Sequence, residues 1–407
     1  MKFVRVAVVL AFVACISPAP VDAQAPRWWK GNLHTHSLWT DGTEFPELIA
    51  AWYREHGYNF VAFTEHDMLQ QGERWVDINA PDQGWPPRNA STRLALALYR
   101  EKYGDWVQER REGERHLVRL RALDEYRHMY ERPGEFLLLN AEEITDRGGA
   151  HVNAFQLSQP ILPRGGETTA QRTTANLAAV REQRTQTGRR SVAIINHPNF
   201  VWSLTAQEIA AMDDARFFEL YNGHMLTNVR GDSVHPGTEQ MWDIMLSLRH
   251  AARRAPIYAV AVDDAHDFRA ASDTISRPGR GWVMVRAPSL ESDALFAALE
   301  RGDFYASTGV TLRDVTAHAD RLRIEIEPTA GATYRTYFIG TRRGTSLEQR
   351  AGIGEVLALV EGTTAEYRPR GDERYVRARI VSSRPHIDPT TGRALGQQTA
   401  WVQPVFR

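Results

Sequence analysis

The amino-acid sequence predicts an α/β fold with close to a barrel's number of strands, followed by a smaller β domain. Short runs of β-branched and aromatic residues alternate with longer amphipathic stretches, which is the pattern of layered α/β proteins. Eight of these runs lie before residue 286, and the long helical patterns end near Thr311. The 407 residues also exceed the roughly 250–300 at which a single core stops growing, so a second domain is expected.

The predicted elements follow one another in the order of the chain. The strand runs cover residues 28–33, 59–63, 136–139, 152–155, 192–195, 217–220, 257–262 and 282–285. The helical stretches cover residues 46–55, 117–130, 168–184 and 238–254.

Two segments depart from this alternation. Residues 70–116 are rich in Pro, Gly, Trp, Arg and Glu, and they predict an inserted loop and helix over one end of the barrel. Such an insertion is either a functional lid or a solvated excursion. Residues 313–407 predict a separate β domain, and its histidines, His318 and His386, lack partners at ligand spacing and are expected at the surface. Its clearest strand runs are 322–326, 334–339 and 375–380.

The composition excludes several classes of protein. With 43% hydrophobic and 24% charged residues, the chain is neither disordered, collagenous nor a membrane bundle. Its formal net charge of −1 creates no field that would attract nucleic acid or anionic lipid. We therefore expect no nucleic-acid partner, and any charged ligand must be recognised locally.

The first 23 residues have the features of a secretory signal peptide. Lys2 and Arg5 precede an apolar run at 6–16 that is too short to span a membrane. Small residues precede a cleavage point after Ala23 or Ala25. This pattern predicts a periplasmic or secreted protein with no stable membrane span after cleavage.

The single cysteine, Cys15, lies within this leader. Cleavage would leave a mature protein with neither disulfides nor thiolate ligands. The alternative is a lipoprotein in which Cys15 becomes the lipidated first residue, but Phe12 and Val13 match such a site poorly.

Histidines and carboxylates gather where the predicted strands end. His34 and His36 are two residues apart on an extended segment, so both rings can reach one cation, and Asp41 follows five residues later. In a parallel barrel the carboxyl ends of all strands meet on one face. His151 instead opens a strand after the turn Gly148-Gly149, which can return it beside the glutamates. The other strand-end groups are Glu65, His66, Asp67, Glu142, Glu143, His197, Asp263, Asp264 and His266.

This joint pattern predicts a multinuclear metal centre. So many imidazoles and carboxylates in one cleft would be poorly compensated without cations. Because the ligands are nitrogen and oxygen only, zinc, manganese and iron are all suitable occupants.

The motifs resemble those of the polymerase and histidinol phosphatase (PHP) superfamily over residues 27–312. The similar segments are HTHS at His34, TDG at Asp41, FTEHD at His66, EEIT at Glu143, GAHVNAF at His151, NHP at His197, ELYNG at Glu219, DDAH at Asp264 and GDFYASTG at 302–309. The resemblance implies a distorted (β/α)7 TIM-like barrel with two or three divalent metal ions at the strand ends. The insertion and the C-terminal β domain resemble a secreted or periplasmic branch that includes carbamate and ester hydrolases.

The resemblance also implies a set of metal ligands. Glu143 is chosen over Glu142 because the family's glutamate precedes an Ile-Ser or Ile-Thr pair, here Ile144-Thr145. Asp41 stands where many members have histidine, which makes the site harder and more anionic. The first metal would be held by His34, His36, Glu143 and Asp264, the second by Glu143, His151 and His197, and the third by Asp41, His66 and His266.

These features predict a metal-dependent hydrolase that uses a metal-bridging hydroxide on a small ester substrate. A third metal favours phosphate esters, so a phosphoesterase is preferred; the alternatives are a carboxylic ester or carbamate hydrolase, or a non-catalytic metal-binding protein. The residues expected to carry catalysis are His34, His36, Glu143, Asp264 and His266.

Further groups are expected around the metals. Glu65, Asp67 and Asp263 either orient imidazoles and relay protons or are ordinary strand-end carboxylates. Five residues in nearby loops are candidates for substrate contacts, with a solvated surface role as the alternative: Arg147, Asn222, His224, Arg277 and Arg280.

Overall fold

The computed structural model describes residues 25–80, 88–269 and 276–406. The predicted signal peptide and Cys15 lie outside these residues. Among the helices that are described, none is long and apolar enough to cross a membrane.

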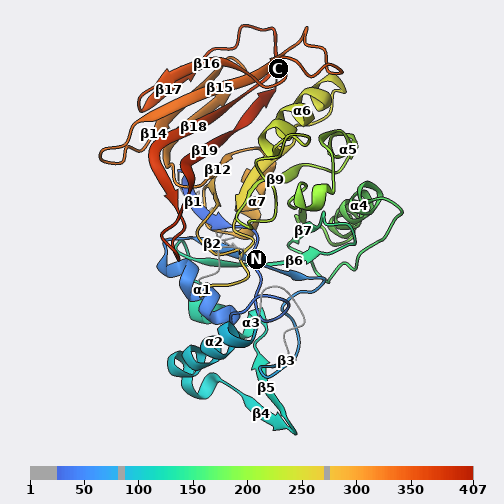
Figure 1. Ribbon diagram of the computed structural model, residues 1–407, viewed down its shortest axis with the longest axis vertical. Helices are drawn as coiled ribbons and strands as arrows, with labels where there is room; N and C mark the ends of the chain where they lie inside the picture. The colour runs from blue at the N-terminus through green and yellow to red at the C-terminus, as the bar shows by residue number, and fades with distance from the viewer. Residues whose placement is uncertain (1–24, 81–87, 270–275, 407) are drawn as a thin grey trace, which may run out of the picture.

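The fold is built on one mixed sheet of 13 strands, to which all eight predicted strands contribute (Figure 1). Their order across the sheet is β10 (Tyr258–Val262), β9 (Phe217–Asn222), β8 (Val192–Ile195), β7 (Val152–Phe155), β6 (Leu137–Ile144), β2 (Phe60–His66), β1 (Arg27–Asn32), β11 (Trp282–Ala287), β12 (Phe304–Ser307), β19 (Ala394–Phe406), β18 (Glu373–Ile387), β15 (Tyr334–Arg342) and β16 (Glu355–Glu361).

Strand direction changes twice within the part of the sheet that carries the predicted motifs. β1, β2 and β6 pair in parallel, and so do β8, β9 and β10. β7 runs antiparallel to both of its neighbours, so the expectation of a wholly parallel set is wrong. The reversal arises because a short turn at 145–151 cannot form a crossover, which needs a dozen or more residues.

The two outer strands of this seven-strand group meet just beyond their carboxyl ends. Thr35, after β1, and Ala265, after β10, form an isolated parallel bridge. The His36 amide donates a hydrogen bond to the Ala265 carbonyl at 2.9 Å, and the Asp264 amide donates one to the His34 carbonyl at 3.1 Å. Two candidate ligand pairs are thus brought side by side by the backbone.

The helices pack around the seven strands. They are α1 (Pro46–Glu55), α3 (Leu123–Tyr130), α4 (Thr169–Thr187), α5 (Ala206–Ala211), α6 (Thr238–Ala251) and α7 (Ser292–Glu300). α4 begins with a capping box between Thr168 and Gln171 and ends at Gly188, which has a φ of 69°. The predicted helix at 117–130 is partly wrong: its first residues form a strand, and the helix begins only at Leu123.

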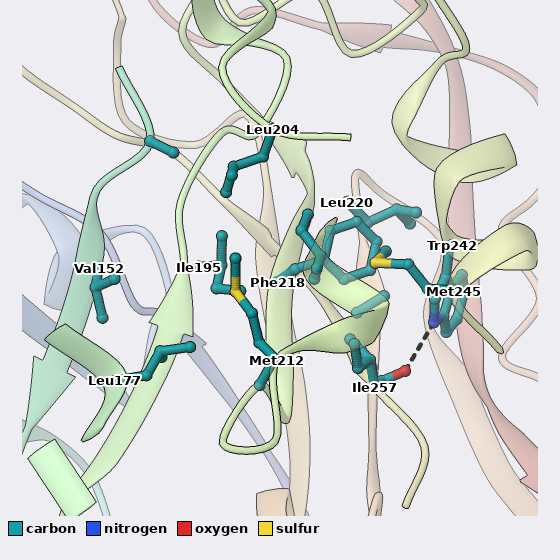
Figure 2. Packing of buried hydrophobic residues seen from close by; sticks show 14 of the residues in the cluster. Val152, Leu177, Ile195, Leu204, Met212, Phe218, Leu220, Trp242, Met245 and Ile257 are labelled. Atoms are coloured by element: carbon teal, nitrogen blue, oxygen red, sulfur yellow. Dashed lines mark hydrogen bonds between the residues drawn. The ribbon is translucent and has the colours of Figure 1, made fainter. Parts of the chain in front are cut away.

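One core cluster packs between β7, β8, β9 and the helices α4 to α6 (Figure 2). Phe218 and Leu220 of β9 pack toward Trp242 and Met245 of α6. The Trp242 indole donates a hydrogen bond to the Ile257 carbonyl at 2.9 Å, so its one polar group is satisfied within the core.

The insertion contains more regular structure than the sequence predicts. It holds β3 (Arg74–Asp77), α2 (Arg88–Tyr103), a 3-10 turn (Gly104–Trp106), β4 (Glu109–Glu112) and β5 (Arg115–Leu120). The three strands form a separate sheet in the order β3-β5-β4, and the insertion projects from the end of the molecule opposite the C-terminal strands (Figure 1). The Ser91 hydroxyl of α2 donates to Asp267 at 3.0 Å, one residue beyond His266.

In the described part of the C-terminal region, residues 312–406, every regular element is a strand. β13 (Leu312–His318), β14 (Arg321–Ile326) and β17 (Thr364–Tyr367) form a three-stranded sheet, whereas the other four extend the main sheet. His318 is exposed as expected, but His386 is not, since it is only 4% exposed. Its ring packs against Tyr221 with centroids 5.9 Å apart, because β18 reaches across to the end of β9.

Candidate metal centre

His34 and His36 follow β1 and belong to a buried cluster of histidines and carboxylates. Both side chains are fully buried. Their Nε2 atoms face each other at 3.1 Å, which places two imidazole nitrogens toward one point. This confirms the expectation that an i, i+2 pair on an extended segment projects to one side.

Glu143, at the end of β6, is the centre of the cluster. Its carboxylate oxygens lie 3.0–3.4 Å from nitrogens of five imidazoles, those of His34, His36, His66, His151 and His197. Glu142 points the other way, as strand alternation requires, and accepts a hydrogen bond from the Ile161 amide at 2.7 Å. The structure therefore places Glu143, and not Glu142, among the imidazoles.

The reversed strand β7 explains how His151 joins this group. The turn after β6 brings the chain back so that His151 Nδ1 lies 3.1 Å from Glu143 Oε1. His197 reaches the same carboxylate at 3.4 Å from the end of β8.

A second group of side chains lies on the more open side of the cluster. Asp41 Oδ2 is 3.1 Å from His66 Nε2 and 3.4 Å from His266 Nε2. The side chains of Asp41 and His66 are 28% and 24% exposed, so this side of the cluster is partly open to solvent. Asp264 connects the two groups, since Oδ1 lies 3.2 Å from His34 Nε2 and 3.6 Å from His266 Nδ1.

All nine predicted metal ligands thus fall within one cluster. Three sets within it have ligand atoms that all lie within 4.8 Å of one another: His36, Asp41, His66 and His266; His34, His36 and Glu143; and His66, Glu143 and His151. His36, His66 and Glu143 each belong to two of these sets, whereas His197 and Asp264 belong to none of them.

The donor set fits divalent cations. His36 Nδ1, His197 Nδ1 and Asp41 Oδ1 are buried and lack hydrogen-bond partners among the described residues. Buried polar atoms without partners are costly, and imidazole nitrogens and carboxylate oxygens are ligands for zinc, manganese and iron.

Burial and neighbouring charges shift the pKa values of the side chains in the cluster. Burial would raise the pKa of Glu143, but His34, His151 and His66 hold it well below its usual range. Burial, with His266 and His66 nearby, lowers the pKa of His36 to about 4, so this ring is neutral and able to coordinate near neutral pH.

The backbone is strained at the cluster. His197, Asp264 and Asp67 have φ values of 22°, 52° and 54°, in the left-handed region that non-glycine residues seldom adopt. Such strain persists only where the surroundings hold it, and it concentrates at functional sites.

Sequence reasoning missed Glu219 as a contributor to the centre. This fully buried residue of β9 lies with Oε1 2.6 Å from His34 Nδ1, and its Oε2 accepts hydrogen bonds from the His197 amide and the Asn222 side chain, each at 2.8 Å. A carboxylate at Nδ1 directs the Nε2 lone pair of His34 into the cluster. The available signal was its position in the strand-end motif ELYNG.

Other partners orient the remaining rings. The Asn196 side chain donates to Glu143 Oε1 at 2.7 Å, Thr145 Oγ1 lies 2.5 Å from His66 Nδ1, and Ser276 Oγ lies 2.9 Å from His266 Nδ1. None of the three was among the predicted site residues.

Each of the three carboxylates expected beside the ligands accepts hydrogen bonds from neighbouring residues. Glu65 is buried and accepts hydrogen bonds from Thr40 and Gln70 at 2.5 and 2.8 Å. Asp67 accepts the Thr145 amide at 2.7 Å and so supports the hydroxyl beside His66. Asp263 accepts the Tyr53 hydroxyl at 2.8 Å, and burial raises the pKa of its carboxyl to about 6.

The five predicted substrate contacts differ in position. Asn222 donates to Asp264 Oδ2 at 3.1 Å, and His224 lies with its ring centroid 5.9 Å from that of His266. Arg147 is exposed. Arg277 and Arg280 are buried beside Asp388, with Arg280 Nε donating to Asp388 Oδ2 at 2.8 Å. The Arg280 guanidinium is therefore buried and paired with the Asp388 carboxylate.

No protein-family model matches the chain, and no curated protein matches it. Two solved structures are similar to it at 14% sequence identity. One is a two-domain protein of Bacteroides vulgatus described as containing a predicted PHP-like metal-dependent phosphoesterase; the match covers 94% of this chain and 96% of that chain, with a TM-score of 0.39. The other, from Bifidobacterium adolescentis, is described as a candidate metal-dependent phosphoesterase; the match covers 62% of this chain and 94% of that chain, with a TM-score of 0.29.

Proposed function

We propose that this protein is a metal-dependent hydrolase of the PHP type that cleaves a phosphate ester at a di- or trinuclear centre. The observation that carries the proposal is the cluster of six imidazoles and three carboxylates, in which Glu143 lies 3.0–3.4 Å from five of the rings. One of its ligand sets is partly open to solvent, which supports a catalytic use of metal, because structural metal sites are usually closed. A distorted seven-stranded barrel is part of this proposal, supported by the bridge between Thr35 and Ala265.

When bound, divalent metals would supply Lewis acidity for hydrolysis at this cluster. Glu143 would be shared between adjacent metals, because both of its oxygens face imidazoles. His34 and His36, with Asp264, would hold the deepest position, and Asp41, His66 and His266 the outermost one. The partial exposure of Asp41 and His66 leaves room there for a substrate oxygen.

The preference for a phosphate ester rests on charge. Arg277 and Arg280 lie buried next to Asp388, so the neutralisation of a dianionic group would fall mainly to the metals. A centre with three metal positions suits that task better than the hydrolysis of a neutral carboxylic ester or carbamate.

The test combines metal analysis with a substrate panel. The purified protein, reconstituted with zinc, manganese or iron, is assayed with an aryl phosphate monoester, an aryl phosphate diester, a carboxylic ester and a carbamate. We expect hydrolysis of a phosphate ester that a chelator abolishes and added metal restores. Activity confined to the carboxylic ester or carbamate would reject the phosphoesterase, and a protein that binds metal but cleaves none of the four would favour the non-catalytic alternative.

We further propose that the protein works outside the cytoplasm, as the leader pattern at residues 1–23 suggests. Its partner would be a small phosphorylated ester and neither nucleic acid nor membrane, in keeping with the formal net charge of −1. Expression with the leader followed by cell fractionation and N-terminal sequencing tests the compartment and the cleavage point, including lipidation at Cys15.

A further inference from the structure

The turn between β18 and β19 (residues 388–393) is one of the places where the C-terminal β region contacts the loops that border the candidate metal centre. Asp388 opens this turn and is 1% exposed. Its Oδ1 accepts hydrogen bonds from the Thr390 and Thr391 amides, both at 2.9 Å, which leaves Oδ2 to face outward from the turn.

Asp388 Oδ2 pairs with an arginine that precedes β11. Arg280 Nε and Nη2 lie 2.8 and 2.6 Å from this oxygen. Arg280 is itself 2% exposed, and its Nη1 donates to the Gly223 carbonyl at the end of β9 at 2.6 Å. Two charges buried this deeply are stabilised only while they remain paired.

The backbone around Arg280 is tied to the residue before a predicted metal ligand. The amides of Gly279, Arg280 and Gly281 donate to the Asp263 carboxylate at 2.9, 2.7 and 2.9 Å. Asp263 directly precedes Asp264, whose φ of 52° must be held by its surroundings.

The same segment, residues 276–281, also holds a ligand ring. The Ser276 carbonyl accepts the His266 amide at 3.2 Å, and Ser276 Oγ lies 2.9 Å from His266 Nδ1. Gly279 has a φ of 86°, and a Cβ there would lie 2.7 Å from Pro389 of the turn, so turn and segment are closely packed.

From these contacts we propose that the C-terminal β region positions the metal centre, with Asp388 acting through Arg280 and segment 276–281 on Asp264 and His266. Asp388 is a positioning residue, since it reaches no ligand itself. The proposal rests on the metal centre proposed above, and it assigns a role to a region whose sequence motifs indicate none.

The test uses the full-length protein and two matched substitutions. Asp388→Asn removes the charge that faces Arg280. Asp243→Asn is the control, because Asp243 of α6 forms another buried pair with an arginine of β18, Arg377, at 2.7 and 2.6 Å. Both substitutions break a buried ion pair between the C-terminal strands and the rest of the protein, but none of the described contacts of Asp243 reaches a predicted metal ligand.

Metal binding is measured by titration with cobalt(II), followed by its visible ligand-field spectrum and by the metal content after a chelator series. For Asp388→Asn we expect affinity to fall by about tenfold and the spectrum to change, since outer partners of metal ligands commonly matter by 10–100-fold. For Asp243→Asn we expect a lower midpoint of thermal unfolding with wild-type cobalt affinity and spectrum. Asp388→Glu, which keeps the charge, should recover part of the affinity and serves as the informative variant if Asp388→Asn does not fold.

Wild-type cobalt binding in both Asp388 variants would overturn the proposal, and so would an equal loss in Asp243→Asn. Cobalt binding is measured without substrate, so the positioning role of Asp388 and the phosphoesterase activity can be rejected independently. A wild-type protein that binds cobalt and hydrolyses nothing refutes only the phosphoesterase, whereas one that binds no metal refutes both.

Discussion

At the scale of single residues, the centre depends on which of two adjacent glutamates faces inward. Glu142 and Glu143 are both buried, but only Glu143 meets imidazoles. Burial raises the pKa of Glu142 to about 8, so this side chain is mostly a neutral acid at pH 7, whereas Glu143 is held as a carboxylate by the rings around it.

This difference predicts that the same substitution, glutamate to glutamine, changes metal affinity at one position and not at the other. Glu143→Gln should lower metal affinity by on the order of a hundredfold or more, because even outer-shell changes cost about 10–100-fold. Glu142→Gln exchanges a neutral acid for a neutral amide that can still accept the Ile161 amide, so binding should stay within about twofold of wild type. Equilibrium dialysis with zinc or manganese measures both, and equal losses in the two variants would show that Glu143 has no special role.

Glu219 offers a second prediction at this scale. The two carboxylate oxygens of Glu219 accept hydrogen bonds from His34, the His197 amide and the Asn222 side chain. A glutamine in this place would have only one oxygen to accept them. We expect Glu219→Gln to weaken metal binding by about 10–100-fold while the protein stays folded.

The control is Glu208→Gln in the capping box of α5, where the exposed glutamate accepts hydrogen bonds from the Thr205 amide and hydroxyl at 2.8 Å, and none of its described contacts reaches a predicted metal ligand. It should alter thermal stability slightly and metal affinity not at all. Isothermal titration with metal distinguishes the two variants, and unchanged affinity in Glu219→Gln would show that this carboxylate does not support His34.

At the scale of elements, the reversed strand β7 was the part least accessible to pattern reasoning. Apolar runs do not report strand direction, and only the short turn containing Gly148 and Gly149 hinted that His151 returns to the glutamates. The prediction of a helix at 117–130 was partly wrong for a related reason. Residues 115–120 pair with β3 and β4 in a small sheet, and this pairing outweighs local helical periodicity.

The turn before β7 should be sensitive to a single methyl group. Gly149 has a φ of 88°, and a Cβ there would lie 2.5 Å from Val201 Cγ2 and 3.2 Å from the Phe200 carbonyl. Gly149→Ala should therefore shift the turn and with it His151, lowering metal affinity as well as stability.

Gly57→Ala is the control for backbone conformation. Gly57 has a φ of 73°, but no atom lies within 4 Å of the position that an alanine methyl group would occupy. Both variants should lose about 1–2 kcal/mol from the left-handed backbone alone, measured by urea unfolding, and only Gly149→Ala should lose metal. Normal metal content in Gly149→Ala would mean that the turn does not set the position of His151.

At the scale of the whole molecule, the C-terminal strands are joined through buried polar groups to the part of the fold that carries the candidate ligands. His386 of β18 is one of these. Burial is the main cause that lowers its pKa to about 4, with the positive charge of Arg280 adding to it and Asp388 opposing it. The ring is therefore neutral in the folded protein at pH 7.

The sign of the resulting pH dependence follows from proton binding. Between about pH 4 and 6.5 the unfolded chain binds a proton at His386 and the folded protein does not, so the free energy of unfolding rises with pH across this window. Acidification from pH 6.5 to 4 should cost a few kcal/mol from this group, at about 1.4 kcal/mol per pKa unit.

We expect His386→Gln to flatten this part of the stability profile and His318→Gln, at an exposed position, to leave it unchanged. Urea unfolding from pH 4 to 7 gives the two profiles. Parallel curves for wild type and His386→Gln would contradict the prediction.

The sequence alone predicts which residues gather at the strand ends and where those strands lie. Strand runs and strand-end histidines and carboxylates are local patterns, and all nine predicted ligands meet in one cluster. It could not determine strand direction, the burial of His386 or the engagement of Arg280 with Asp388, because these depend on contacts between residues far apart in the chain. These features follow from the tertiary structure, because the packing of distant strands sets which side chains share a buried space and therefore which charges must be paired.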